Sequence, residues 1–236
     1  MPSLRILSGG AAQGLVTALA AQFEAETGYA IDGEFGAVGT MATKLRSGAP
    51  ADLLILTSKL IGELAAEGYV ASGATADVGI VQTALAVRSG DAPPSLESGA
   101  AMKAALLAAD EIYFPDPQQA TAGIHFAKVL ESVGIWNRVE DRARTYPNGA
   151  KAMCELAAST SERPIGCTQA TEILNTPGVT LVGSLPRGYE LATVYTAAVC
   201  AKAASPAVAR ALVALLTDAT SLEHRKSAGF GRVDGP

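Results

Sequence analysis

The sequence has little of the material from which metal sites and nucleic-acid interfaces are built. Aromatic residues make up 5% of the 236 residues, and the only histidines are His125 and His224. A histidine-rich metal site is therefore excluded, and bases or sugars would find few aromatic faces. Lysine and arginine form no basic run, and the net charge is −5 at pH 7. Because phosphate contacts need clustered cations, we expect no nucleic-acid partner.

Cysteine is also scarce. Cys154, Cys167 and Cys200 match no zinc-binding or redox spacing, and each lies among apolar neighbours. We therefore expect buried thiols, with no metal and no cofactor.

Long hydrophobic runs are missing as well. No stretch reaches membrane-spanning length without interruption, so we expect no direct membrane insertion. The start, Met1-Pro2-Ser3, is followed at once by Leu4–Leu7 and lacks the charged segment and cleavage site of a signal peptide. As written, the sequence indicates a cytoplasmic protein; a periplasmic one would require that a signal peptide had been removed.

Short apolar runs alternate with segments of helical periodicity along the whole chain. This order predicts an α/β protein with mostly parallel strands flanked by helices. The segment 89–98 is rich in Pro and Gly and predicts a loop. We expect strands over 4–7, 30–35, 52–56, 78–87, 111–114, 164–168, 180–185 and 194–201. We expect helices over 14–27, 40–47, 59–67, 122–133, 148–159 and 206–216.

Four loops rich in small or hydroxyl residues come directly before predicted helices. They are Ser8–Ala11, Gly36–Thr40, Thr121–Gly123 and Pro147–Gly149. At the carboxyl ends of parallel strands, free N–H groups and the helix dipole favour an anion. Each loop by itself is equally compatible with an ordinary turn and helix cap, but four in one chain indicate a binding site for a small anion.

Catalytic motifs are absent from the sequence. There is no Ser-His-Asp set, no phosphate-binding loop and no dinucleotide fingerprint. His125, in the first turn of a predicted helix, and Tyr146 are the candidate catalytic residues, with Tyr195 a further candidate. For His125 a capping or surface role is the alternative. Cys167 is predicted to be a core residue.

Several motifs, in order, resemble the periplasmic molybdate-binding family. The segment Gly48–Leu53, the pair Asp116-Pro117 followed by Ala122-Gly123, the stretch Arg163–Gly166, and the closing Ala228–Phe230 carry the resemblance. It implies a two-lobed type II periplasmic-binding-protein fold with a ligand cleft between the lobes. The implied lobes are 1–82 plus 198–236 and 83–197, with crossover strands near 80–87 and 193–201. It also implies a monomeric receptor that serves an ABC transporter permease.

The resemblance also points to ligand-binding positions. That family holds tetrahedral oxyanions with two serine hydroxyls, a tyrosine and backbone amides, and the matching positions here are Ala11, Val38 or Gly39, and Gln169. Without those hydroxyls a dehydrated oxyanion lacks hydrogen bonds, so we expect a di- or tricarboxylate rather than molybdate. The predicted ligand-binding residues are Ser8, Gly9, Gly10, Ala11, Val38, Gly39, Thr40, Thr121, Ala122, Gly123, Asn148 and Gln169. Arg88 is a further candidate that could pair with a carboxylate; the alternative is a solvated arginine at the end of a strand.

A second resemblance concerns a branch of the same fold. Ser8-Gly9-Gly10, Gly166–Gln169, Ile173–Val179 and Leu185-Pro186 are similar to the branch that contains aconitate isomerase. This resemblance implies a soluble isomerase of small unsaturated polycarboxylates, acting by allylic proton transfer. Receptor and isomerase both remain open at this point, with the receptor slightly favoured.

Overall fold

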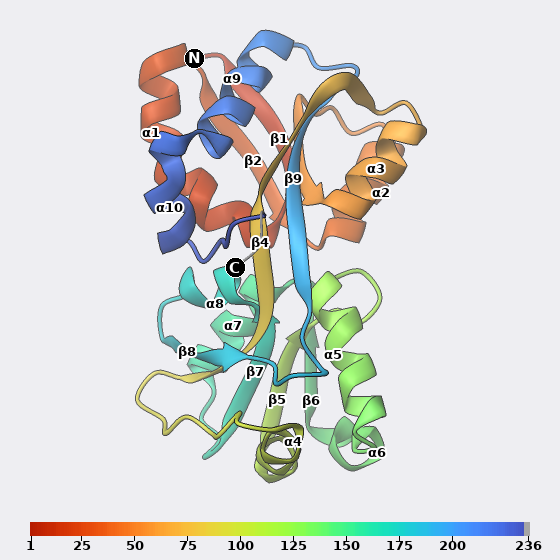
Figure 1. Cartoon of the computed structure of the whole chain (residues 1–236), viewed down its shortest axis with the longest axis vertical. Coiled ribbons are helices and arrows are strands. Elements are labelled where there is room, and N and C mark those ends of the chain that lie inside the picture. The colour runs from red at the N-terminus through yellow and green to blue at the C-terminus, as the bar shows by residue number, and fades with distance from the viewer. Residues whose placement is uncertain (234–236) are drawn as a thin grey trace. The chain divides into compact units, whose positions relative to one another are not determined.

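The computed structural model describes residues 1–233 and divides into two compact units. Unit 1 contains residues 1–81 and 193–233, and unit 2 contains residues 82–192. The boundaries expected from the sequence fell after residue 82 and after residue 197. The chain therefore leaves unit 1 in one strand and returns to it in another (Figure 1).

Unit 1 is built on a sheet with strand order β2-β1-β3-β9-β4. β1 is parallel to β2 and β3, and β9 is antiparallel to β3. The strands are β1 (Ser3–Gly9), β2 (Ala30–Gly36), β3 (Leu53–Thr57), β9 (Ala192–Cys200) and the first part of β4 (Val70–Arg88). The helices are η1 (Gly10–Ala12), α1 (Gln13–Thr27), α2 (Val38–Arg46), α3 (Ser58–Ala66), α9 (Pro206–Thr217), η3 (Ala219–Ser221) and α10 (Leu222–Ser227).

The core of unit 1 follows the periodicity of the sequence. Leu15, Leu19 and Phe23 are all buried on one face of α1. Leu53–Leu56 of β3 is buried at every position, as in a parallel strand covered on both faces. Gly28, with φ 73°, ends α1 in the left-handed conformation that glycine adopts without strain.

Unit 2 contains a second sheet, in which β4 is followed by β7, β5 and β6, and β8 pairs with β4. β5 is parallel to β6 and β7, while β4 is antiparallel to β7 and β8. The strands new to this unit are β5 (Glu111–Pro115), β6 (Ala143–Tyr146), β7 (Pro164–Gln169) and β8 (Val179–Ser184). Its helices are α4 (Gly99–Ala108), α5 (Thr121–Ser132), α6 (Trp136–Val139), η2 (Glu140–Arg142), α7 (Gly149–Ala158) and α8 (Ala170–Leu174).

Two apolar layers cover the two faces of the unit 2 sheet. Leu85 packs in one cluster with Met102 of α4 and Phe126 of α5. Ala84 packs in the other cluster with Met153 of α7. Because side chains alternate along β4, α4 and α5 cover one face and α7 covers the other.

Some local expectations are corrected. β4 starts at Val70 rather than at residue 78, because β4 pairs with β9; in addition, Thr196 Oγ1 donates to Asp77 Oδ1 at 2.6 Å. Cys154 lies on the exposed side of α7, so the expectation of a buried thiol is wrong there, while Cys167 and Cys200 are buried. In the described part of the chain, no helix has the length and apolarity needed to cross a membrane.

Candidate functional site

Two helix starts without a side-chain cap lie at one edge of the unit 1 sheet. β1 ends at Gly9 and β2 at Gly36, and these residues are register partners in the parallel pair. Neither Gly9 nor Ala37 caps the helix that follows it, whereas the Thr57 side chain accepts the N–H of Leu60 and caps α3. The N–H groups at the starts of η1 and α2 are therefore not capped by a side chain, and they are candidate anion-attracting groups.

The predicted ligand-binding residues of unit 1 lie together at this edge. A Cβ at Gly9 would lie 2.9 Å from the Tyr195 ring and 2.9 Å from a methyl group of Val38, so only glycine lets these side chains close around the end of β1. Gly10 and Ala11 are buried in η1, while Gly39 and Thr40 are half-buried at the start of α2. This edge offers small side chains and backbone N–H groups.

Ser8 is the expected hydroxyl donor of unit 1, but its hydroxyl already has a partner. The side chain is fully buried, and Oγ donates to the carbonyl oxygen of Gly9 at 3.0 Å. The neighbouring candidates Ala11 and Val38 carry no polar side-chain atom. A ligand at this edge would therefore depend on backbone donors and on the hydroxyl of the half-buried Thr40.

In unit 2, α5 begins against the end of β5. A Cβ at Gly123 would lie 2.2 Å from the Pro115 carbonyl oxygen and 2.3 Å from that of Asp116. Glycine is thus required for the first turn of α5 to pack on the strand end. Ala120, the residue before the helix, gives no side-chain cap, so Thr121 and Ala122 begin α5 with their N–H groups uncapped by a side chain.

Gln169 is the feature of unit 2 that most clearly indicates a missing partner. It ends β7, and its side chain is only 2% exposed. Both amide atoms, Nε2 and Oε1, are buried without a hydrogen-bond partner. A buried polar group without a partner costs about 1–3 kcal/mol, so native proteins rarely keep one unless it serves a ligand or another function.

Thr83, which the sequence analysis did not single out, lies directly opposite Gln169. The two residues are register partners in the antiparallel pair of β4 and β7. Thr83 is fully buried, and its hydroxyl also lacks a partner. Thr171, two residues after Gln169, has a second buried hydroxyl without a partner. No sequence motif marks Thr83, because its relation to Gln169 arises from strand pairing.

The start of α7 is already occupied by groups of the chain itself. Asn148 Oδ1 accepts the N–H of Lys151 at 2.9 Å, which is an ordinary helix cap. The carboxylate of Glu172 accepts a hydrogen bond from Thr168 Oγ1 at 2.5 Å, and backbone N–H groups of Gly149 and Ala150 also bond to it. Burial raises the pKa of Glu172, and these hydrogen bonds oppose the rise. Asn148 therefore acts as a cap, and the carboxylate of Glu172 occupies the anion position of this helix.

The side chains of Gln169 and Glu172 lie on opposite faces of the unit 2 sheet. Side chains alternate along β7, so Gln169 points to the face covered by α5, and Thr168, the partner of Glu172, points to the face covered by α7. The uncapped start of α5 thus lies over the same face as the Gln169 amide.

His125 has a partner on the same unit. Its Nε2 lies 2.7 Å from the carbonyl oxygen of Tyr189, so Nε2–H donates and Nδ1 is left to accept a proton or a hydrogen bond. Tyr146 ends β6, and its ring stacks on Tyr113 with centroids 6.1 Å apart and planes at 8°. His125 is thus hydrogen-bonded to the segment that precedes β9, and Tyr146 of β6 stacks on Tyr113 of β5.

Arg88 lies away from Gln169. It ends β4 at the opposite edge of the sheet, near the start of β7. Its guanidinium donates to the carbonyl oxygen of Ser159 at 2.5 Å and pairs with Asp91 at 3.0 Å. The structure does not bring Arg88 together with the other candidates of unit 2.

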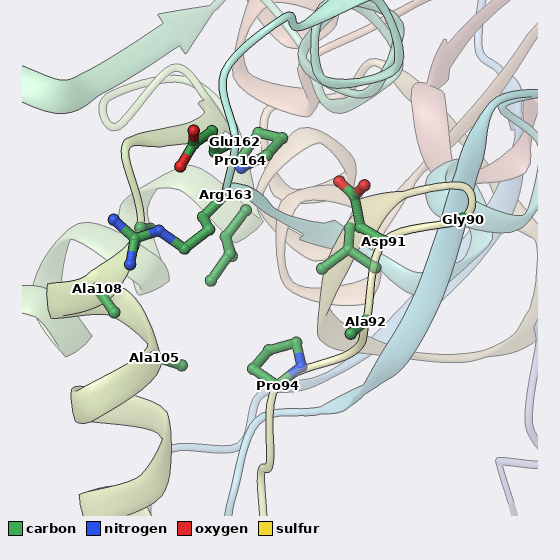
Figure 2. A pocket seen from close by; sticks show the side chains of 12 residues that line it. Gly90, Asp91, Ala92, Pro94, Ala105, Ala108, Glu162, Arg163 and Pro164 are labelled. Atoms are coloured by element: carbon green, nitrogen blue, oxygen red, sulfur yellow. The ribbon is translucent and has the colours of Figure 1, made fainter.

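A cavity of about 490 Å³ also lies at that opposite edge (Figure 2). Ala105 and Ala108 of α4 form one wall, and the segment Gly90–Pro94 faces them. Arg163 at its rim is paired with Asp110 at 3.0 Å. In residues 1–233, no group of three or more His, Cys, Asp and Glu side chains is placed to hold a metal ion.

The comparisons with known proteins agree with this fold. The chain belongs to the family of bacterial extracellular solute-binding proteins, whose model matches residues 4–231. It is 26% identical over 236 residues to an aconitate isomerase from Pseudomonas sp, covering 97% of this chain and 87% of that protein. It is 25% identical over 186 residues to the molybdate-binding protein ModA of Escherichia coli (strain K12), covering 77% and 70%.

A solved structure supports the fold. The periplasmic molybdate-binding protein of Azotobacter vinelandii has a TM-score of 0.81 to this chain at 20% identity, covering 97% of this chain and 99% of that one. The expected type II periplasmic-binding-protein fold is therefore confirmed.

Proposed function

We propose that this member of the solute-binding family binds a small di- or tricarboxylate, with Gln169 as its principal side-chain contact. The observation that supports this most directly is the amide of Gln169, which is 2% exposed and has no partner for either polar atom. Thr83, directly opposite, adds a hydroxyl, and the uncapped start of α5 adds backbone N–H groups.

Two features favour a carboxylate over a bare tetrahedral oxyanion. The hydroxyl of Ser8 is bonded to Gly9, and Ala11 and Val38 have no polar side-chain atoms, so unit 1 supplies no free hydroxyl at these positions. The Gln169 amide both donates and accepts, which suits a ligand with mixed hydrogen-bonding groups.

For the biological role, we propose a monomeric receptor that delivers its ligand to the permease of an ABC-type uptake system. The family description and the molybdate-binding relative support this role. A receptor of this kind requires a periplasmic location, which is part of the proposal.

The second candidate is an isomerase of aconitate-like carboxylates. It is favoured by the aconitate isomerase relative, which matches 97% of this chain. Moving a proton along an allylic framework needs a base near the substrate, and Nδ1 of His125 is a proton-accepting atom because Nε2 is bonded to Tyr189. In this candidate Tyr146 would be a further acid–base group.

A thermal-shift screen tests the binding proposal. The panel contains molybdate, tungstate, sulfate, phosphate and di- and tricarboxylates including both aconitates. A ligand that binds only the folded state raises Tm, so we expect shifts with carboxylates. Gln169→Ala should weaken binding by about 1–3 kcal/mol, because it leaves ligand groups without a partner. Gln22→Ala, an exposed glutamine of α1, is the matched control and should leave binding unchanged. Shifts with molybdate or tungstate alone would contradict the proposal.

Incubation with trans-aconitate in D2O separates the two roles. Appearance of the cis isomer with deuterium at the allylic carbon, followed by NMR, would identify an isomerase. Binding without isomerisation or exchange would identify a receptor.

A further inference from the structure

We propose that the ligand carries a hydroxyl group beside a carboxylate, and that Gln169 recognises both groups with its two amide atoms. This inference rests on the proposed carboxylate-binding function and adds the chemical class of the ligand.

The pairing of β4 with β7 brings Thr83 and Gln169 as close as facing strand residues can be. The backbone N–H of Thr83 donates to Leu191 at 2.9 Å and its carbonyl oxygen accepts from Leu185 at 3.3 Å, so both backbone groups point away from β7. Thr83 and Gln169 are therefore a non-hydrogen-bonded pair, in which the facing side chains approach most closely. Even so, the two side chains make no hydrogen bond to each other, and neither has another hydrogen-bond partner.

The unsatisfied groups set conditions on the ligand. Nε2 of Gln169 and the hydroxyl of Thr83 can donate to a carboxylate, but Oε1 of Gln169 can only accept. A fully ionised oxyanion offers no hydrogen to Oε1 and repels it. A carboxylate with a neighbouring hydroxyl satisfies both ends of the amide, since its carboxylate oxygen accepts from Nε2 and its hydroxyl donates to Oε1.

The rest of unit 2 places the carboxylate on the Gln169 face. The start of α7 is filled by the carboxylate of Glu172 and by Asn148, so its N–H groups are not available to a ligand. α5, on the Gln169 face, begins without a side-chain cap at Ala120. The charge of the ligand is thus attracted to the start of α5, where the hydroxyl next to it can meet Oε1.

Calorimetric titration with matched pairs of acids tests the inference. The pairs are L-malate with succinate and citrate with tricarballylate, because the members of each pair differ by one hydroxyl group. We expect the hydroxy acid of at least one pair to bind about tenfold or more tightly than its partner, since a site with a buried polar atom rejects the analogue that leaves it unpaired. In Gln169→Met, which keeps the shape of the side chain, this ratio should fall to about one.

Two further variants complete the experiment. Thr83→Val removes a donor that serves the carboxylate of all four acids, so it should weaken all of them and preserve the ratio within each pair. Gln22→Met repeats the glutamine change on the exposed face of α1 and should preserve both affinity and ratio.

The outcomes separate the inference from the function on which it rests. If both members of each pair bind the unchanged protein equally, hydroxyl recognition is overturned while carboxylate binding stands. If none of the four acids binds and only oxyanions do, the proposed function itself fails. A ratio that survives in Gln169→Met assigns hydroxyl recognition to another residue and overturns the inference.

Discussion

Glu172 is a buried carboxyl group whose hydrogen-bond donors all belong to the start of α7 and the end of β7. They are the hydroxyl of Thr168 and the backbone N–H groups of Gly149, Ala150 and Gln169. A Cβ at Gly149 would lie 1.9 Å from Glu172 Oε2, so glycine is what lets the carboxylate reach the helix start. An internal anion here stabilises α7 through the helix dipole.

Glu172→Gln should change how stability depends on pH. Burial raises the pKa of Glu172 above its ordinary value of 4.5. The stability linked to its protonation is therefore present below about pH 4.5 and is lost as pH rises through the folded-state pKa. Glutamine does not titrate, so the free energy of unfolding of the variant should rise relative to that of the unchanged protein as pH increases.

Urea unfolding at steps from pH 4 to pH 8 measures this difference. Glu155→Gln, which removes the partner of Lys151 on α7, is the control. A difference between Glu172→Gln and the unchanged protein that is constant with pH would contradict the account of Glu172.

At the scale of elements, two glycines in helices have opposite surroundings. A Cβ built at Gly123, in the first turn of α5, would meet the carbonyl oxygens of Pro115 and Asp116, whereas nothing lies within 4 Å of a Cβ built at Gly62 in α3. Gly123 thus holds α5 against β5, and Gly62 has no packing role.

Alanine at these two positions should shift stability in opposite directions. Gly123→Ala forces α5 away from the end of β5 and should cost about 1–3 kcal/mol of unfolding free energy. It should also weaken ligand binding, because the start of α5 moves relative to Gln169. Gly62→Ala should add about 0.5–1 kcal/mol by lowering the flexibility of the unfolded chain. Thermal unfolding of both variants measures the changes; equal effects would refute the packing argument.

At the scale of the whole molecule, Asp52 joins distant parts of the discontinuous unit 1. Its carboxylate accepts the backbone N–H of Arg5 at 3.0 Å, of Ala204 at 2.7 Å and of Ser205 at 3.2 Å. The side chain is 2% exposed. The segment that returns from unit 2 is thereby tied to β1, and α9 gains an acceptor at its start.

Asp52→Ala should destabilise the protein by about 3 kcal/mol, because it leaves buried N–H groups without an acceptor. Chemical denaturation measures the loss. Asp32→Ala, an exposed aspartate of β2, should change stability by less than about 0.5 kcal/mol. If Asp52→Ala lost as little stability as Asp32→Ala, the result would show that apolar packing alone holds the returning segment.

The sequence by itself determined the type and order of most elements and the positions of the helix starts. Hydrophobic periodicity records which face of a segment is buried, so α1 and β3 could be predicted from local pattern. Small residues before helices marked Gly9, Val38 and Gly123, and the resemblance of short motifs pointed to Gln169. β6 and α4 were missed, because an edge strand of four residues and an alanine-rich helix carry little periodic signal.

Only the tertiary structure decided which polar groups are satisfied. Thr83 faces Gln169 because of the register between β4 and β7, and no local pattern encodes register between distant strands. The carboxylate of Glu172 occupies the start of α7, so Asn148 serves as a cap. Arg88 lies at the opposite sheet edge because β4 runs antiparallel to β7. Whether a buried polar atom has a partner depends on residues far apart in the chain, so this property emerges only when the sheets and helices pack.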